Sequence, residues 1–487
     1  MAEELTPDIC VIGGGPGGLA AAAAAADAGA KVVLVERGRL GGNNLVRGSV
    51  PSKALLASAD VYAMLRKAPD FGVNGAPLQV DLPRVRDHMA AAADAIGATY
   101  APERLAALGI AVVNGTARFA NPDLVAVETT AIRARHFIIA AGSTPAMPDL
   151  PGLDTAEPFT FAEAFDLTRR PSHLIVLGAG AHALEIAQAY ARLGMDATVV
   201  SETAALPEAD TELAAMVVDR LRAEGIGLRV GVKVTQIARR RSGLRISLTD
   251  PADGEINIDG SHVLVATGRR PDVEALGLAA AGIASGPDGI SVDRNLRTTN
   301  RRAYAIGDAI DGPPLVERAR REGVAVIRNI MRRVPVGAPA AHVPFVAFTD
   351  PALAQIGMSE GEARARHRDI RVVRIPYAGN ERAEIEHDAN GVIKVITTAS
   401  GSRILGAGVA GGRASELIAP FALAIANGLG LAALSAFVPP YPTRSEMVPR
   451  LATGDRGGAA SLGATRGVGS LTEEWLKRII GLAGNLG

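Results

Sequence analysis

The glycine-rich run Gly-Gly-Gly-Pro-Gly-Gly at residues 13–18 constrains the fold of this chain more than any other segment. A short apolar run rich in β-branched residues precedes it at residues 8–12. An alanine-rich stretch follows at residues 19–30, and then a second apolar run at residues 31–35. Glycine and proline interrupt regular structure, and short apolar runs fit buried strands. The order therefore predicts a strand, a tight turn, a helix and a second strand.

Three glycines of this turn have separate tasks in a unit that binds a dinucleotide. Gly13 permits the tight turn, Gly15 lets the backbone approach a pyrophosphate, and Gly18 lets the helix pack on the strand. The helix N-terminus offers unpaired N–H groups and a positive dipole end to the phosphate. Glu36 follows the second strand, where an acid can bind the ribose hydroxyls of an adenosine.

The same pattern returns in the middle of the chain, after an apolar run at residues 174–177. Gly178, Gly180 and Ala183 occupy the three turn positions, and the third position accepts alanine as well as glycine. The sequence therefore predicts two dinucleotide-binding units in one chain.

The end of the second unit bears on the choice of nicotinamide nucleotide. The strand ends at Ser201 instead of an acid, which favours NADPH. Glu202 follows directly, however, and the nearest arginine cluster, at residues 239–241, belongs to another segment. Both NADPH and NADH stay open as the hydride donor.

Four further segments appear in an order that is typical of one enzyme family. They are residues 137–143, which end in Ala-Ala-Gly142-Ser, residues 263–271, which contain Ala-Thr-Gly268-Arg, residues 304–308, which end in Gly-Asp308, and residues 343–351. With the two glycine turns, they make the chain resemble the pyridine nucleotide-disulfide oxidoreductases from residue 8 to about residue 450.

The resemblance implies an α/β fold with two Rossmann-like domains and an α+β C-terminal dimerisation domain. It also implies FAD and NAD(P)H as cofactors, a homodimer, and binding of the ribityl chain of FAD by Asp308. The expected domains are residues 1–150 and 271–340 for FAD, 151–270 for NAD(P), 341–452 for dimerisation, and 453–487 for a linker and an amphipathic helix.

The redox-active segment of that family departs from its pattern here. Relatives carry G-G-x-C-x-x-x-[GS]-C-x-P-[ST]-K, and Asn44 and Ser49 stand at the two cysteine positions. The family's C-terminal histidine is replaced by Tyr441, whereas Glu446 of the same motif is kept. A phenol with a pKa of about 10 is a poor general base near neutrality. The only cysteine, Cys10, lies in an apolar strand and is expected to be buried and inert.

The residues that serve the nicotinamide side are retained. Lys53 and Glu185 match the family's pair beside the flavin N5, where a lysine stabilises the electron density that accumulates on reduction. Ala181 replaces a larger residue over the nicotinamide pocket, which indicates easier access. A helix that begins near residue 315 is expected to direct its positive end at the flavin. Glu317, in place of a common histidine, has no assigned role.

These features favour an FAD-dependent NAD(P)H oxidoreductase that passes electrons directly from the flavin to a non-thiol, quinone-like small molecule. The vacated face would be lined by Asn44, Ser49 and the partner's Tyr441 and Glu446. Two alternatives remain: a soluble transhydrogenase, whose members also lack the dithiol and carry Tyr-Pro-Thr, and a non-catalytic flavin-binding sensor or assembly subunit. The helix at residues 184–190 resembles that of mercuric reductases, but mercury handling needs soft thiolate ligands.

The amino-acid composition limits the kinds of partner and metal site that the chain can have. The formal net charge is zero and aromatic residues make up 3% of the chain, which argues against nucleic acid as a partner. One cysteine excludes an intrachain disulfide and a cysteine metal cluster, and no metal site is expected. The acidic N-terminus lacks the pattern of a secretory signal, so a cytoplasmic location is expected. An apolar stripe at residues 475–483 suggests docking on the dimer, on a partner protein or on a membrane surface.

Overall fold

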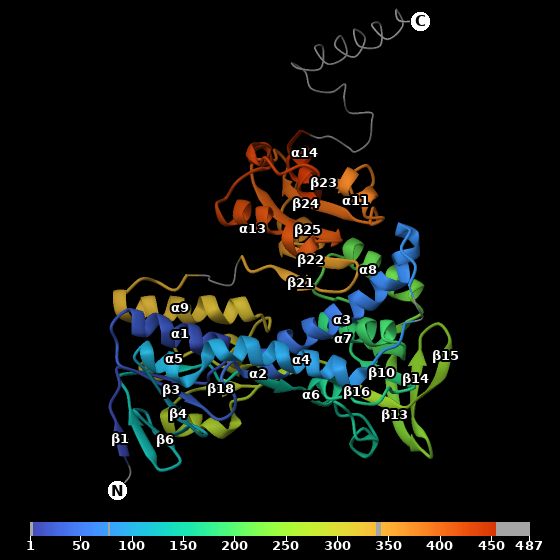
Figure 1. The fold of residues 1–487 in the computed structure, drawn as a ribbon. Coiled ribbons are helices and arrows are strands. Elements are labelled where there is room, and N and C mark those ends of the chain that lie inside the picture. The colour runs from blue at the N-terminus through green and yellow to red at the C-terminus, as the bar shows by residue number, and fades with distance from the viewer. Residues whose placement is uncertain (1–2, 76–77, 338–341, 454–487) are drawn as a thin grey trace, which may run out of the picture. The chain divides into compact units, whose positions relative to one another are not determined.

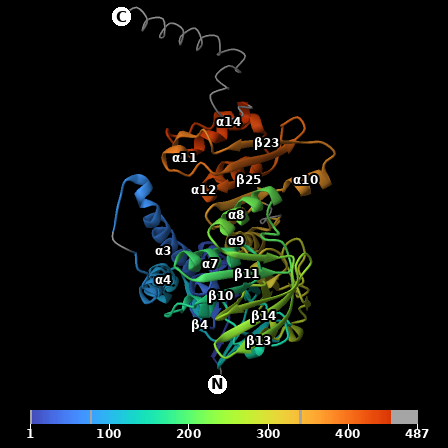
Figure 2. The ribbon, with the colours of Figure 1, turned by 90° about the vertical axis from the view of Figure 1, so that its right-hand side faces the viewer.

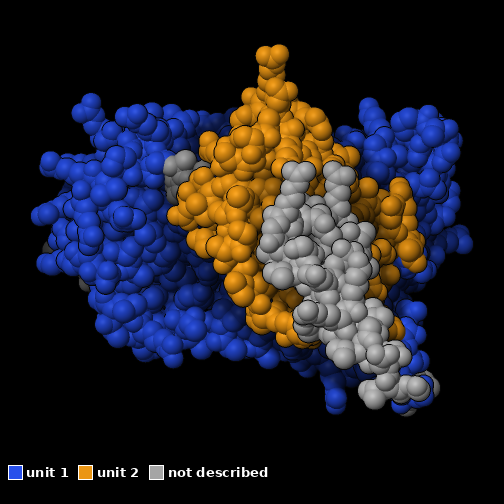
Figure 3. All heavy atoms as spheres, turned by 90° about the horizontal axis from the view of Figure 1, so that it is seen from above, with its two compact units in different colours: residues 1–205, 224–343 blue, residues 206–223, 344–487 orange. Residues whose placement is uncertain are grey.

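The structure of the 487-residue chain is a computed structural model, which describes residues 3–75, 78–337 and 342–453 (Figure 1). The chain forms two compact units, which Figure 3 distinguishes by colour. Unit 1 comprises Met1–Ala205 and Glu224–Val343, and unit 2 comprises Leu206–Ala223 and the chain from Pro344 onward. The chain thus leaves unit 1 for a short segment, returns, and leaves again.

The first nucleotide unit is built on a five-stranded parallel sheet of unit 1. Its strand order is β20 (Ala303–Ala305), β8 (His136–Ile139), β2 (Ile9–Ile12), β3 (Val32–Glu36) and β4 (Ile110–Asn114). The central strands are apolar along their whole length because both faces of a parallel sheet are covered. On one face, helix α1 (Pro16–Asp27) packs against α9 (Val316–Arg332).

The second nucleotide unit repeats this plan with a four-stranded parallel sheet. The order is β12 (Gly227–Val230), β11 (Asp196–Ser201), β10 (His173–Leu177) and β16 (His262–Val265). Helix α7 (Ala181–Arg192) follows β10, as α1 follows β2, and the strands β10 and β11 can be followed in Figure 2. The two predicted strand–turn–helix–strand units are therefore both present.

Smaller elements complete unit 1. Strands β9 (Ser143–Pro145) and β17 (Arg269–Pro271) pair as a ribbon that joins the carboxyl ends of β8 and β16. Two accessory sheets are formed by β1 (Glu3–Leu5), β7 (Thr130–Arg133), β6 (Leu124–Val127) and β5 (Arg118–Asn121), and by β13 (Lys233–Arg240), β14 (Gly243–Asp250) and β15 (Gly254–Gly260). The short strands β18 (Ser285–Gly286) and β19 (Gly289–Ile290) pair with each other. The other α-helices of unit 1 in the described residues are α2 (Gly42–Val46), α3 (Ser49–Lys67), α4 (Leu82–Gly97), α5 (Pro102–Ala107) and α6 (Phe161–Phe165).

Unit 2 has a five-stranded antiparallel sheet at its centre. Its order is β21 (Phe345–Ala347), β22 (Ala352–Gly357), β25 (Ile404–Gly411), β24 (Val392–Thr398) and β23 (Ile370–Pro376). Its helices are α8 (Thr211–Ala223), α10 (Glu360–Arg366), α11 (Glu381–Ile385), α12 (Ala414–Leu417), α13 (Ala419–Ala426) and α14 (Met447–Thr453). Helix α8 therefore packs with the C-terminal sheet, although the sequence places it inside the predicted NAD(P) domain, residues 151–270.

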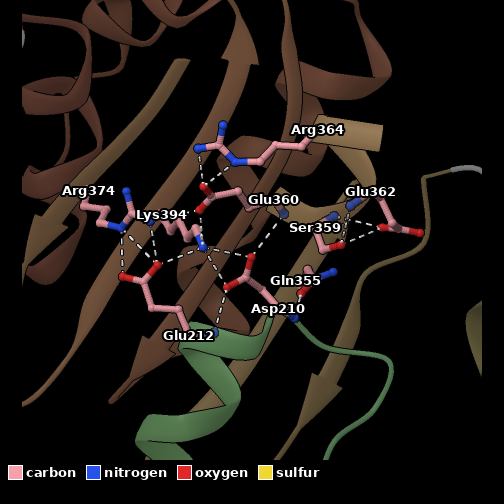
Figure 4. A network of polar contacts seen from close by, with 9 residues as sticks. All are labelled: Asp210, Glu212, Gln355, Ser359, Glu360, Glu362, Arg364, Arg374 and Lys394. Carbon is pink, nitrogen blue, oxygen red and sulfur yellow. Dashed lines mark hydrogen bonds and ion pairs between the residues drawn. The ribbon is translucent and has the colours of Figure 1, made fainter. Parts of the chain in front are cut away.

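A buried lysine fastens α8 to that sheet (Figure 4). Lys394 on β24 is 2% exposed, and its Nζ contacts Asp210 Oδ1 at 2.8 Å, Glu212 Oε2 at 2.8 Å and Glu360 Oε2 at 2.9 Å. Arg374 adds a bidentate pair with Glu212, at 2.8 and 2.7 Å. A buried ammonium is tolerated only when carboxylates surround it in this way, so the network specifies where the start of α8 lies.

The predicted linker and amphipathic helix fall almost entirely outside the described residues, which end at Thr453. Within the described part of the chain, no helix is both long and apolar enough to span a membrane.

The carboxylates around Lys394 generate a prediction for acid stability. The hydrogen bond from Arg374 lowers the pKa of Glu212 to about 2, and the hydrogen bond from Lys394 lowers that of Glu360 to about 2. An unfolded glutamate titrates near ~4.3. Both groups therefore stabilise the fold above pH ~4.3, and this contribution is lost as the pH falls towards 2.

Thermal unfolding measured between pH 6 and pH 3 should show this loss. The double variant Glu212→Gln, Glu360→Gln should be less stable at pH 6 and should lose less stability on acidification than the wild type. Equal slopes for the two proteins would contradict the assignment.

Candidate active site

The first nucleotide turn can be built only from glycine at two of its positions. Gly13 has φ +105°, and a Cβ there would lie 2.3 Å from the carbonyl oxygen of Ala140. A Cβ on Gly18 would lie 1.8 Å from the carbonyl oxygen of Gly13. Both contacts are backbone against backbone, so no side-chain movement can relieve them.

The third glycine faces open space where a phosphate would be expected. Apart from chain neighbours, no heavy atom of the described residues lies within 4 Å of a Cβ built on Gly15. Gly15 is also the N-cap of α1, and no side chain in the described chain caps this helix. Unpaired N–H groups at a helix N-terminus beside open space fit a pyrophosphate.

Glu36 lies beside this turn. Its Oε2 accepts a hydrogen bond from the N–H of Gly14 at 2.5 Å, and its Oε1 accepts one from that of Gly38 at 2.7 Å. The carboxylate is therefore fixed at the carboxyl end of β3, where an adenosine ribose would be held. The turn and the acid together fit the dinucleotide that the sequence predicts.

The second nucleotide turn has nearly the same geometry. Gly178 has φ +106°, and a Cβ there would lie 2.3 Å from the carbonyl oxygen of Ala266. Gly180 faces open space among the described residues and is the N-cap of α7, again without a side-chain cap among them. Ala183 is 1% exposed, so its methyl group fits the packing that the third position requires.

The structure separates the arginine cluster from the end of β11. Arg239 lies near the far end of β13 and pairs with Glu157 at 2.9 Å. Six residues of strand, about 20 Å, separate it from Lys233, which follows Val232. The N–H of Val232 donates to the carbonyl oxygen of Ser201. Two cations therefore lie near the end of β11: Lys233, which follows Val232, and Arg229 on β12, which is opposite Val200. Neither was identified from the sequence.

A chain of hydrogen bonds joins Asp308 to the ribbon of β9 and β17. The hydroxyl of Ser143 donates to Asp308 Oδ2 at 2.6 Å, and Arg269 Nε donates to the Ser143 hydroxyl at 2.7 Å. Asn43 Nδ2 donates to the carbonyl oxygen of Ser143 at 2.7 Å. Burial lowers the pKa of Arg269, whereas the charge of Asp308 opposes that shift.

This network places the two Ala-x-Gly strand ends in one site. Gly142 and Gly268 both have positive φ, at +76° and +128°, and each directly precedes a ribbon strand. Asn43, Ser143 and Arg269 were missed at the sequence level. The only signal for them was their position next to residues of the recognised motifs.

Lys53 and Glu185 join α3 to α7. The distance between Lys53 Nζ and Glu185 Oε2 is 2.6 Å, and the side chains are 29% and 1% exposed. Ser49 begins α3 one turn before Lys53, so both lie on one side of that helix. Asn44 lies in the short helix α2, which precedes α3. Of the two positions that hold cysteine in relatives, one is therefore the first residue of the helix that carries the lysine, and the other lies in the short helix before it.

Cys10 does not replace the missing thiols. Its side chain is fully buried in β2, and burial raises its pKa to about 12. The predicted structural role of this cysteine is confirmed, because a buried thiol of that pKa supplies no thiolate near neutrality.

Tyr441 and Glu446 belong to unit 2, whereas the residues just described belong to unit 1. Tyr441 is 72% exposed, and its hydroxyl donates to Glu381 Oε2 at 2.5 Å. The hydrogen bond to Glu381 raises the pKa of this phenol. Glu446 Oε2 instead accepts the N–H of Thr443 at 3.2 Å. Tyr441 therefore remains a neutral hydroxyl near pH 7, and its hydrogen-bond partner Glu381 was not identified from the sequence.

Two further side chains, one in α7 and one in α9, have contacts that the sequence did not predict. His182, the second residue of α7, makes an edge contact with the ring of Phe161, with 6.0 Å between ring centroids. Desolvation lowers its pKa, and the charge of Glu185 opposes this shift, so the ring is neutral near pH 7. Glu317, which had no assigned role, lies in the first turn of α9 and pairs with Arg320 at 3.6 Å.

Comparison with known proteins agrees with this geometry. Residues 7–323 match the family described as pyridine nucleotide-disulphide oxidoreductase, and residues 343–452 match the dimerisation domain of the same family. The chain belongs to the pyridine nucleotide-disulphide oxidoreductase family, whose members use FAD and NAD(P)H. The predicted fold class is thereby confirmed.

Individual relatives cover most of the chain. A dihydrolipoyl dehydrogenase of Thermus scotoductus is 35% identical over 453 residues, which is 91% of this chain and 95% of the relative. A mercuric reductase of Streptomyces lividans is 33% identical over 451 residues, which is 90% of this chain and 94% of the relative. The crystal structure of LpdA from Mycobacterium tuberculosis superposes with a TM-score of 0.84 at 27% identity, over 92% of this chain and 99% of that one.

The Lys53–Glu185 pair leads to a prediction for flavin reduction. Lys53→Met should slow reduction of the bound flavin by NAD(P)H about 100-fold, because a preorganised charge at the developing anion is lost. Anaerobic stopped-flow absorbance measures this rate. Lys67→Met, which changes an exposed lysine at the end of the same helix, is the control and should have no effect. A Lys53→Met protein that reduces as fast as this control would refute the role.

Proposed function

We propose that this protein is an FAD-dependent NAD(P)H oxidoreductase that delivers electrons from reduced flavin directly to a non-thiol, quinone-like acceptor. One observation carries the proposal. The 2.6 Å Lys53–Glu185 pair of the nicotinamide side is intact, whereas the dithiol positions hold Asn44 and Ser49. The sole cysteine is buried and remains protonated.

NAD(P)H would bind on one face of the flavin and the electron acceptor on the other, and different residues of the chain would line each face. Bound FAD would supply a two-electron carrier that takes a hydride from NAD(P)H. On the nicotinamide side, Lys53 would place a positive charge beside the carrier, and Glu185 would hold that lysine in place. On the other side, Asn44 and Ser49 would present neutral donors and acceptors to the oxygen atoms of the acceptor.

The dimer would complete the acceptor face. The chain carries the family's dimerisation domain, and in a homodimer Tyr441 and Glu446 would come from the partner. Hydrogen bonding to Glu381 keeps the phenol protonated, so Tyr441 would not act as a base. Its single O–H would leave Glu381 and donate to a carbonyl oxygen of the acceptor instead. This role differs from that of the family's histidine, which acts as a base for the thiols.

Oxidation of dihydrolipoyl groups and reduction of mercuric ion, the activities for which the relatives are named, are not part of the proposal. Both need an accessible thiolate, and Cys10 offers none.

Anaerobic double-mixing kinetics test the proposal. The protein is first reduced with NADPH or NADH and is then mixed with a benzoquinone, with oxidised lipoamide, or with the other oxidised nicotinamide. We expect rapid reoxidation by the quinone only. Rapid reoxidation by the nicotinamide would support a transhydrogenase instead, and turnover of lipoamide would overturn the proposal. Reduction by neither nucleotide would favour the non-catalytic sensor.

Tyr441→Phe separates the two half-reactions. Removal of the hydroxyl should leave flavin reduction by NAD(P)H unchanged and should slow reoxidation by the quinone about tenfold, since one hydrogen bond to a polarised oxygen is lost. Glu381→Gln keeps a hydrogen-bond acceptor for the phenol and serves as the matched control. Equal reoxidation rates in the wild type and in Tyr441→Phe would remove Tyr441 from the acceptor site.

A further inference from the structure

Helix α7 carries a buried polar stripe that nucleotide binding does not explain. Glu185, Gln188 and Arg192 are 0%, 0% and 8% exposed, and their spacing of three and four residues places them on one face. The other buried residues of α7 are mostly alanine, leucine and isoleucine. Polar groups in such a position destabilise a fold unless they are fully paired. The partners of these three side chains therefore help to determine how α7 packs against its neighbours.

Arg192 has two carboxylate partners on different segments. It makes a bidentate pair with Glu224, with Nη2–Oε1 at 2.7 Å and Nε–Oε2 at 3.0 Å. Its Nη1 contacts Asp60 Oδ1 on α3 at 2.8 Å. Gln188 Nε2 also donates to Glu224, at 3.2 Å. The planar guanidinium matches this fork geometry, which lysine cannot reproduce.

The Asp60–Arg192 pair repeats the Lys53–Glu185 pair along the same two helices. Asp60 follows Lys53 by seven residues, and Arg192 follows Glu185 by seven. Seven residues are two helical turns, about 10.5 Å. The helices therefore run in the same direction and are joined by two ion pairs, which we call the α3–α7 ladder.

The polarity of the α3–α7 ladder alternates. On α3 the cation comes first and the anion second, whereas on α7 the order is reversed. Displacing α3 by two turns would bring Asp60 opposite Glu185, or Lys53 opposite Arg192, and either arrangement sets like charges together. A displacement of one turn would break both pairs. Only one register satisfies the ladder.

We propose that Asp60, Arg192 and Glu224 are positioning residues that hold α3 in register against α7 and thereby fix the Lys53 ammonium beside the flavin. The inference rests on the part of the proposed function that places Lys53 at the flavin. The effect acts through the helix and not through direct charge, because two helical turns, about 10.5 Å, separate Asp60 from Lys53. The Asp60 side chain is 60% exposed, so solvent screens its charge.

The mildest probe is Asp60→Asn. The Asp60 side chain is 60% exposed, so its loss should change the unfolding temperature little. We expect flavin reduction by NAD(P)H to slow three- to tenfold and the flavin reduction potential to fall. A tenfold change in the equilibrium of this two-electron couple corresponds to about 30 mV. Asp60→Glu should restore most of the rate and potential.

A matched control removes a similar ion pair that does not join the two helices. Asp87→Asn breaks the Arg86–Asp87 contact on α4, which is also 2.8 Å long and whose aspartate is 66% exposed. This variant should leave the rate and the potential at wild-type values. Arg192→Met, a stronger change at a buried position, should lower the rate and the potential further if the protein folds.

The potential is measured by dithionite titration with mediators, which requires neither a nicotinamide nor an acceptor. It therefore remains informative even if no quinone is reduced and the proposed function fails. If Asp60→Asn matches Asp87→Asn in both potential and reduction rate, the positioning role is overturned, whatever happens to the unfolding temperature. A lower potential that Asp60→Glu rescues supports it.

Discussion

The two nucleotide units depend on one constraint, the close approach of a turn to the carboxyl end of a neighbouring strand. At Gly13 and at Gly178 a Cβ would lie 2.3 Å from a carbonyl oxygen, and the φ values differ by only one degree. Each turn is followed by a helix, α1 or α7, and the N-cap glycine of that helix faces open space among the described residues. The ribbon of β9 and β17 then joins the two strand ends and supplies Ser143 and Arg269 to the Asp308 network.

Ion pairs join helix α3, which follows strand β3 of the first nucleotide unit in the chain, to helix α7 of the second nucleotide unit. Helix α3 starts at the vacated dithiol positions, carries Lys53, and contacts α7 through ion pairs of opposite polarity. Asn44 and Ser49, which stand at the two cysteine positions of relatives, lie in α2 and at the first residue of α3. The Asp60–Arg192 pair, which we propose sets the register of α3, lies farther along the same helix. Substitutions at the two cysteine positions would therefore leave the position of the lysine undisturbed.

Most of the fold could be predicted from the sequence because glycine turns and apolar runs encode local geometry directly. Gly13, Gly178 and the strand before each turn are examples. The partners of Asp308 and Arg192 could not be predicted, since Ser143, Asp60 and Glu224 become neighbours only after distant segments pack. The position of α8 could not be predicted either, because Lys394, which fastens it, lies about 180 residues later and is not part of any recognised motif.

Helix α8 also shows that a domain defined by sequence can differ from a unit that folds together. The family's dimerisation domain begins at residue 343, yet Lys394 within it is surrounded by carboxylates from residues 206–223 as well as from its own segment. A dimerisation domain exchanged between relatives at that boundary would leave behind Asp210 and Glu212. Such an exchange is expected to succeed only where the transferred sheet carries a cation at the position of Lys394 and the retained segment carries the matching carboxylates. The two segments should therefore be inherited together.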